Sequence, residues 1–367
     1  MRKMNKELLH SKLNDWYEMN HRILPWRETT DPYKIWISEI ILQQTRVAQG
    51  MEYYHRLITR FPDIQSLADA QEDEVLLYWQ GLGYYSRARN LHKAAQLMKN
   101  HEIFKLNNDN INNVATESTP SVAKGKTSEL LNSEQIFSAL KSMPGVGDYT
   151  AGAIASFAFN LPYPALDGNV YRVLSRLFDC EIAFDTTQGK KHFRQLAEDL
   201  LDREHPRLFN SAIMELGALH CVPTAPACHT CPINTWCKAL ANNTVELLPV
   251  RKPRPKVRDR YLEYTIYITP EKTTLIHQRK GNDIWKHLWE FVCAERTGEE
   301  AIRRKAKGEK ILELTHVLSH QKLHARFVIK KVSELPRIPD TLVVKLSDLD
   351  NYAFSRLTLN AIEKLLY

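Results

Sequence analysis

The chain has 367 residues, 43% hydrophobic and 25% charged, so it is long enough for two domains and has an ordinary globular composition. Its net charge of +7 fits a polyanionic partner such as nucleic acid, without requiring one. The sequence contains no apolar run suited to a membrane span or a signal peptide, so we expect an intracellular protein, in which stable disulfides are rare.

The N-terminal part of the chain has helical periodicity. Apolar residues recur at three- and four-residue steps in 6–17, 31–47, 72–98 and 169–178, with no useful strand-like alternation between them. Residues from about 101 to 132 are rich in Asn, Ser, Thr and Lys and lack this periodicity, so we expect an exposed insertion between two helices. The sequence predicts an all-α domain here.

The pattern changes towards the C-terminus. Residues 246–260 mix Arg and Lys with three prolines, which predicts an extended basic linker. Residues 261–367 then alternate apolar and polar side chains and close with a predicted helix over 355–367, so a mixed α+β domain is expected. Its strand candidates are 261–269, 273–279, 311–319, 322–332 and 341–349.

A helical hairpin with a glycine turn is predicted over about 137–160. Gly145 and Gly147 permit a tight turn and the close approach of another molecule. The N–H groups that open the second helix would form a phosphate site, which positions a protein on DNA without reading its sequence. An ordinary corner of the fold is the alternative interpretation.

Two carboxylates lie in contrasting surroundings. Glu39 lies in a helix that is apolar nearly all round, where burial would raise its pKa; a place at the solvent edge is the alternative. Asp167 precedes a helix, where it would be the N-cap and the helix dipole would keep it ionised; capping alone is the alternative. Two carboxylates whose pKa values are pushed apart suit acid-assisted glycosidic cleavage.

Four cysteines lie close together in the loop 221–237. Their spacing is C-x6-C-x2-C-x5-C, and ligand chemistry alone is compatible with either zinc or an iron–sulfur cluster. The four candidate ligands are Cys221, Cys228, Cys231 and Cys237.

Over nearly the whole chain, these segments resemble the helix-hairpin-helix DNA glycosylase (endonuclease III) superfamily and, within it, the MutY family of adenine DNA glycosylases. The resemblance implies an all-α helix-hairpin-helix glycosylase domain over 1–245 with a [4Fe–4S] cluster loop at 221–237, then an α+β Nudix-like lesion-recognition domain over 261–367. It rests on the four cysteines and on "LPWR" at 24–27, "DPYKIWISEIILQQTRV" at 31–47, "GLGYYSRARNL" at 81–91, "MPGVGDYTAGAI" at 143–154 and "LDGNVYRVLSR" at 166–176.

The resemblance also implies catalytic roles. Glu39 would protonate the adenine leaving group at N7, and Asp167 would stabilise the oxocarbenium-like sugar by charge or by transient attachment. Asn169 would support these carboxylates by hydrogen bonding. Tyr149 occupies the position at which the related lyases carry a Schiff-base Lys, so the resemblance implies a monofunctional enzyme that leaves an abasic site.

The DNA contacts that the resemblance implies come from both domains. Two residues would line the adenine pocket, two would wedge into the base stack, the two hairpin glycines would contact phosphate, and three residues would lie at the 8-oxoguanine. In this last loop Leu318 replaces the usual Phe. In the same order, these residues are Arg27, Gln44, Leu82, Tyr84, Gly145, Gly147, His316, Ser319 and His320.

The function that the resemblance implies is hydrolytic excision of adenine paired with 8-oxoguanine, or with G, from double-stranded DNA. We expect a monomer in the bacterial cytoplasm, associated with the nucleoid. Residues 296–310 lack an acidic Nudix box, so pyrophosphatase activity is not expected. The alternatives are an endonuclease III-like glycosylase/lyase for oxidised pyrimidines and a non-catalytic, metal-containing DNA-binding protein.

Overall fold

A computed structural model describes residues 4–105, 131–253, 257–297 and 310–366. Most of the expected insertion, the middle of the linker and most of the segment without a Nudix box lie outside these residues. The chain forms two compact units: Met1–Gln44 with Ala94–Pro253, and Thr45–Lys93 with Arg254–Tyr367. None of the described helices has both the length and the apolar character needed to cross a bilayer.

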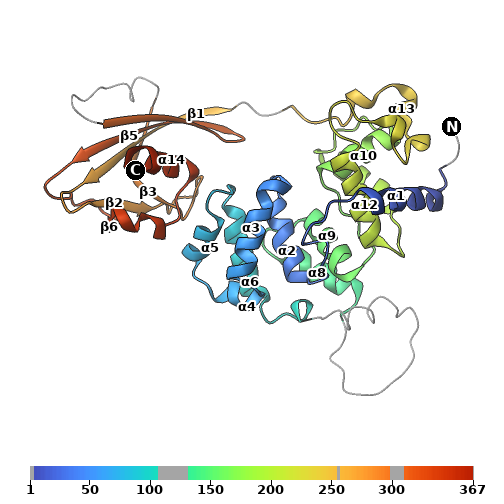
Figure 1. The fold of residues 1–367 in the computed structure, drawn as a ribbon, viewed down its shortest axis with the longest axis horizontal. Coiled ribbons are helices and arrows are strands. Elements are labelled where there is room, and N and C mark those ends of the chain that lie inside the picture. The colour runs from blue at the N-terminus through green and yellow to red at the C-terminus, as the bar shows by residue number, and fades with distance from the viewer. Residues whose placement is uncertain (1–3, 106–130, 254–256, 298–309, 367) are drawn as a thin grey trace, which may run out of the picture. The chain divides into compact units, whose positions relative to one another are not determined.

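The first unit is helical, as predicted (Figure 1). Helices α2 and α9 are apolar all round and pack against each other, while α1 and α10 both pack against α12. Asp31 caps α2 and Pro32 opens it, which fixes where this buried helix begins. The elements are α1 (Lys6–Asn20), α2 (Pro32–Leu42), η1 (Glu102–Phe104), α8 (Ser133–Ser142), α9 (Asp148–Phe159), α10 (Gly168–Phe178), α11 (Thr187–Leu200), α12 (Pro206–Leu219), η2 (Cys228–Thr230), η3 (Asn234–Trp236), α13 (Lys238–Asn242) and η4 (Val245–Leu247).

The second unit begins with four helices. The helical pattern predicted over 72–98 is divided between two of them. A loop over residues 80–85 interrupts it, because Gly81 and Gly83 adopt φ values of 96° and 79° that a helix does not accept. The helices are α3 (Val47–Arg60), α4 (Ile64–Asp69), α5 (Glu72–Trp79) and α6 (Ser86–Met98), the last of which continues into the first unit.

The rest of the second unit is a six-stranded sheet with the order β4-β5-β1-β3-β2-β6. Strands β1 and β5 pair in parallel and the other neighbours pair antiparallel. All five predicted strands are confirmed, whereas β3 was missed because it buries Glu290 directly beside Phe291, which breaks the alternation. The elements are β1 (Arg258–Ile268), β2 (Thr273–Gln278), β3 (Trp289–Arg296), β4 (Lys310–Val317), β5 (Gln321–Lys331), β6 (Thr341–Lys345), η6 (Leu346–Asn351) and α14 (Arg356–Leu366).

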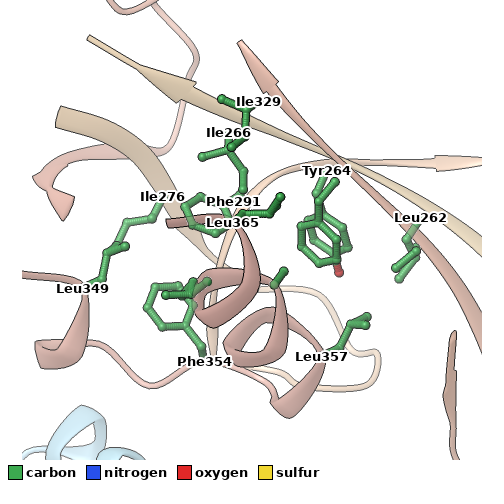
Figure 2. Close-up of a cluster of buried hydrophobic side chains, with 14 of the residues drawn as sticks. Leu262, Tyr264, Ile266, Ile276, Phe291, Ile329, Leu349, Phe354, Leu357 and Leu365 are labelled. Carbon is green, nitrogen blue, oxygen red and sulfur yellow. The ribbon is translucent and has the colours of Figure 1, made fainter. Parts of the chain in front are cut away.

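The core of the sheet lies between the strands and α14. Figure 2 shows Leu357 and Leu365 of α14 on the face of the sheet where Tyr264 and Phe291 of the strands also lie. Phe354, just before the helix, is also buried in this cluster, and its ring stacks on Phe291 with the centroids 6.1 Å apart. This packing immobilises the backbone at Phe354.

Candidate active site and nucleic-acid interface

Glu39 is buried in the middle of α2, with 1% of its surface exposed, which excludes a place at the solvent edge. Burial raises the pKa of its carboxyl, as the sequence predicted. Two partners oppose this shift: the Arg27 guanidinium, whose Nη1 lies 3.7 Å from Oε1, and the Tyr149 hydroxyl, which donates to Oε2 at 2.6 Å. Glu39 is therefore a buried carboxyl held at both oxygens.

Tyr149 lies in the first turn of α9, immediately after the glycine turn. Burial raises the pKa of its phenol well above the ordinary range, so the hydroxyl remains a neutral donor to Glu39. The sequence singled out this position only because it lacks the Lys of the lyases. The bond to Glu39 depends on the packing of α9 against α2.

Arg27 lies with its guanidinium against an aromatic face. Its Cζ is 3.7 Å from the centroid of the Phe157 ring, and Nη2 donates to Met214 Sδ at 3.8 Å. Its Nη1 is buried without a hydrogen-bond partner among the described residues, because the 3.7 Å separation from Glu39 exceeds hydrogen-bond length. This leaves an unsatisfied donor directly beside the Glu39 carboxyl, and the contact of Arg27 with adenine remains a prediction.

Asp167 is the N-cap of α10, as predicted. Its Oδ1 accepts from the backbone N–H groups of Asn169 and Val170 at 2.9 and 2.8 Å, and Oδ2 accepts from Asn169 Nδ2 at 2.8 Å. Burial nevertheless outweighs these bonds and raises the pKa of Asp167, so the expected opposite shifts of the two carboxyls are wrong. The charge of Asp167 also raises the pKa of Glu39, so the two carboxyls interact electrostatically.

A buried arginine that the sequence did not single out connects Asp167 to the cysteine loop. Arg172 Nη2 donates to Asn169 Oδ1 at 2.9 Å and to Gly217 O at 2.6 Å. Its Nε donates to Cys221 O at 2.7 Å. Asn169 thus bridges Arg172 and the Asp167 carboxylate. The sequence shows that Arg172 lies three residues after Asn169 in the same predicted helix. It does not show that Arg172 contacts the cysteine loop.

The four predicted cysteine ligands all belong to the loop that follows α12, and all are free thiols. Burial raises the pKa of Cys231 to about 12, and the charges of the other three thiols add to this shift. Among the described residues, no three His, Cys, Asp or Glu side chains converge as a single-ion site. Arg176 fixes the loop by donating to Cys221 Sγ at 3.4 Å and to Val222 O at 2.7 Å.

The predicted hairpin is present as α8, a turn and α9. Gly145 has a φ of 81°, and Gly147 is the N-cap of α9 without a side-chain cap. Gln43, the C-cap of α2, donates to Thr150 Oγ1 of α9 at 3.2 Å and to the Gly145 carbonyl of the turn at 3.5 Å. Gln44 follows in a left-handed conformation and is exposed. The phosphate contacts of the glycines and the base contact of Gln44 remain predictions.

The remaining predicted DNA-contacting residues line one pocket of the second unit. This pocket, of about 410 Å³, lies between the wedge loop, residues 80–85, and the lesion loop, residues 316–320. Tyr84 is 48% exposed, whereas Leu82 is buried, and insertion of either side chain into a base stack remains a prediction. Five residues that were predicted to contact DNA line this pocket: Leu82, Tyr84, His316, Ser319 and His320.

Trp285 forms a further wall of this pocket. It has a left-handed φ of 58°, and its ring lies at 60° to that of His316 with the centroids 5.8 Å apart. Burial lowers the pKa of His316, which favours the neutral imidazole. The pocket therefore offers aromatic and apolar surface together with the polar groups of Ser319 and His320.

The chain matches two known classes of protein domain: residues 37–202 match the HhH-GPD superfamily of base excision DNA repair proteins, and residues 263–364 match the NUDIX domain. The solved structure of a thermostable thymine-DNA glycosylase, 23% identical, covers 65% of this chain and 97% of its own with a TM-score of 0.51, which supports the helical fold.

Sequence relatives narrow the assignment. An adenine DNA glycosylase of Buchnera aphidicola subsp. Baizongia pistaciae is 34% identical, with 88% of this chain and 86% of that protein covered. The adenine DNA glycosylase of Homo sapiens is 37% identical over 62% of this chain and 38% of that protein. The chain belongs to the adenine DNA glycosylase family, whose members are hydrolases of N-glycosidic bonds.

Proposed function

We propose that this protein removes adenine paired with 8-oxoguanine from double-stranded DNA and leaves an abasic site. The observation that carries the proposal is the buried Glu39 carboxyl, which receives the Tyr149 hydroxyl bond and lies within electrostatic reach of Asp167. An acid whose pKa is raised by burial and a second carboxylate that can oppose positive charge are the groups that glycosidic cleavage requires.

In the proposed reaction Glu39 donates its proton to N7 of the extruded adenine. The C1′–N9 bond then breaks, and its electron pair leaves with the base. The Asp167 carboxylate stabilises the positive charge that develops on the sugar. Water adds at C1′ and returns a proton to Glu39. Arg27 and Tyr149 orient Glu39 through the whole cycle, and Asn169 orients Asp167.

The proposal specifies hydrolysis without strand cleavage. A lyase reaction needs an amine that attacks C1′ and forms a Schiff base. At the corresponding position this chain has Tyr149, whose raised phenol pKa keeps the oxygen neutral and a poor nucleophile. The expected products are therefore free adenine and an intact strand with an abasic site.

Recognition of 8-oxoguanine is proposed for the pocket between the wedge loop and the lesion loop. Tyr84 is exposed enough to stack on a base, and Ser319 and His320 offer hydrogen-bond groups that could distinguish the oxidised purine edge from guanine. Leu318 supplies apolar contact in place of an aromatic ring. The proposal also retains the expectation of a monomer that acts on nucleoid DNA in the bacterial cytoplasm.

A [4Fe–4S] cluster is proposed for the cysteine loop because the resemblance to the glycosylase family implies one there. The donors of this loop are four free thiols, a set that ligand chemistry alone would allow to hold either a zinc ion or a cluster. Cys221, Cys228, Cys231 and Cys237 would hold the cluster. When bound, it would supply structural cross-linking of the loop. Arg172 and Arg176 hold this loop against α10.

Single-turnover excision assays test the proposed function. Wild-type protein should release adenine from an 8-oxoguanine·A duplex and leave a duplex with an oxidised pyrimidine intact. Glu39→Gln should bind the first duplex with unchanged affinity and lose about 100- to 10,000-fold in rate. The exposed Glu18→Gln serves as a matched control and should keep the wild-type rate.

Three results would contradict the proposal. Strand cleavage at the oxidised pyrimidine would favour the lyase alternative. Binding without turnover on every duplex would favour a non-catalytic protein. A fully active Glu39→Gln would remove Glu39 from its role.

A further inference from the structure

The pocket between the wedge loop and the lesion loop, called the lesion pocket below, has two walls from segments more than 200 residues apart in the chain. Tertiary contacts must therefore set the distance between these walls. The wedge loop joins α5 to α6, whereas the lesion loop joins β4 to β5 of the sheet. Contacts between the helices and the sheet domain within the second unit therefore determine the width of the pocket.

Two side chains of the wedge loop form hydrogen bonds with the backbone of one residue of the sheet domain, Phe354. Gln80 Oε1 accepts from the Phe354 N–H at 2.8 Å, and the Tyr85 hydroxyl donates to the Phe354 carbonyl at 3.2 Å. The two ends of the loop thus satisfy both backbone polar groups of one residue. Because Phe354 is 1% exposed and packed in the core of the sheet, this anchor point is rigid.

Hydrogen bonds of the Tyr85 and Tyr53 side chains also fix the shape of the wedge loop. The Gly81 N–H donates to the Tyr85 oxygen at 3.1 Å, and the Tyr53 hydroxyl donates to the Gln80 carbonyl at 2.9 Å. Gly81 has a φ of 96°, and a Cβ there would lie 2.5 Å from the Tyr53 oxygen. Burial raises the pKa of Tyr85 to about 12, so its hydroxyl remains a donor over the working pH range.

Other helix–sheet contacts lie outside this loop. Glu72 pairs with His287, and Asp73 accepts from Gln278 at 2.9 Å; all four side chains are at least partly exposed. Exposed pairs of this kind contribute little. The buried bonds of Gln80 and Tyr85 are the ones that act directly on the loop that carries Leu82 and Tyr84.

We propose that Gln80 and Tyr85 are positioning residues that fix the wedge loop to the lesion-recognition domain, so that discrimination of 8-oxoguanine from guanine depends on them. The inference rests on the proposed function and adds to it a determinant of specificity. Loss of either bond frees one wall of the pocket. Glu39 and Asp167 belong to the other compact unit and keep their partners, so basal excision persists.

The test compares single-turnover excision from 8-oxoguanine·A and G·A duplexes, with the rate ratio as the readout. Tyr85→Phe and Gln80→Met should each lower the ratio by about fivefold or more, as expected for loss of a buried hydrogen bond, because the 8-oxoguanine·A rate falls more than the G·A rate. Gln80→Glu keeps an acceptor for the Phe354 N–H and should restore the ratio. Tyr78→Phe, on α5 but outside these bonds, should leave it unchanged.

Each outcome is decisive. An unchanged ratio in Tyr85→Phe and Gln80→Met overturns the inference, and so does a parallel fall of both rates, since that is general damage. If Tyr85→Phe does not fold, the comparison of Gln80→Met with Gln80→Glu still decides. A wild-type protein that excises adenine from neither duplex would refute the proposed function itself. A wild type and variants that prefer the 8-oxoguanine·A duplex to the same degree would refute only the positioning role of Gln80 and Tyr85.

Discussion

Tyr149→Phe tests how the hairpin helix serves the buried acid. The change removes one oxygen, whose bond to Glu39 Oε2 is 2.6 Å long, and leaves the ring in place. Since Glu39 is 1% exposed, no water replaces the lost donor readily, and loss of such a buried bond costs about 1–3 kcal/mol. If that bond persists in the transition state, the excision rate should fall by about 5- to 160-fold.

The pH profile separates this effect from simple damage. Glu39 acts in its protonated form, so activity falls as the pH rises through its pKa. The Tyr149 hydroxyl lowers that pKa, because it favours the ionised carboxylate. Tyr149→Phe should therefore raise the pKa of Glu39 and shift the alkaline limb of the profile to higher pH.

Single-turnover rates on an 8-oxoguanine·A duplex across pH measure both effects. Tyr163→Phe, which loses only a 3.4 Å bond to the Ser133 carbonyl, is the matched control and should keep the rate and the profile of the wild type. A Tyr149→Phe enzyme with the wild-type rate and an unmoved alkaline limb would refute the reasoning.

Three further variants probe α10, the helix α12 that packs on it, and the cysteine loop. Arg172→Gln orphans acceptors on Asn169 and Cys221, so the free energy of unfolding should fall by about 1–3 kcal/mol per acceptor in denaturant titration; an unchanged midpoint would contradict the role of Arg172. Gly217→Ala places a Cβ 2.7 Å from Asn169 Cβ, so the free energy of unfolding should fall by about 1–3 kcal/mol and excision should slow. Wild-type stability would show that α10 and α12 can separate freely. If Cys231 holds the proposed cluster, Cys231→Ser should lower the iron and sulfide content in chemical analysis; full iron content would exclude Cys231 as a ligand.

The parts of the site that the sequence predicted depend on near neighbours. Asp167 precedes a helix with an apolar stripe, which is enough to assign an N-cap. Glu39 lies in a helix without a polar face, so its burial followed from composition. Gly145 marked the hairpin turn because few other residues accept its φ of 81°.

The parts that the sequence did not predict depend on tertiary packing. Tyr149 and Glu39 are 110 positions apart, and their bond exists only because α9 packs on α2. The pKa of Asp167 moved opposite to expectation because the surrounding fold, and not the helix dipole, dominates its solvation. The anchoring of Gln80 on Phe354 joins residues 274 positions apart and left no local pattern to find.

The most direct test of the account is identification of the products from an 8-oxoguanine·A duplex under single-turnover conditions. Wild-type protein should release free adenine, detected by mass spectrometry, and leave the strand intact until alkali cleaves it at the abasic site, while Glu39→Gln binds the duplex without releasing base. Absence of free adenine with the wild type, or adenine release by Glu39→Gln at the wild-type rate, would contradict the account.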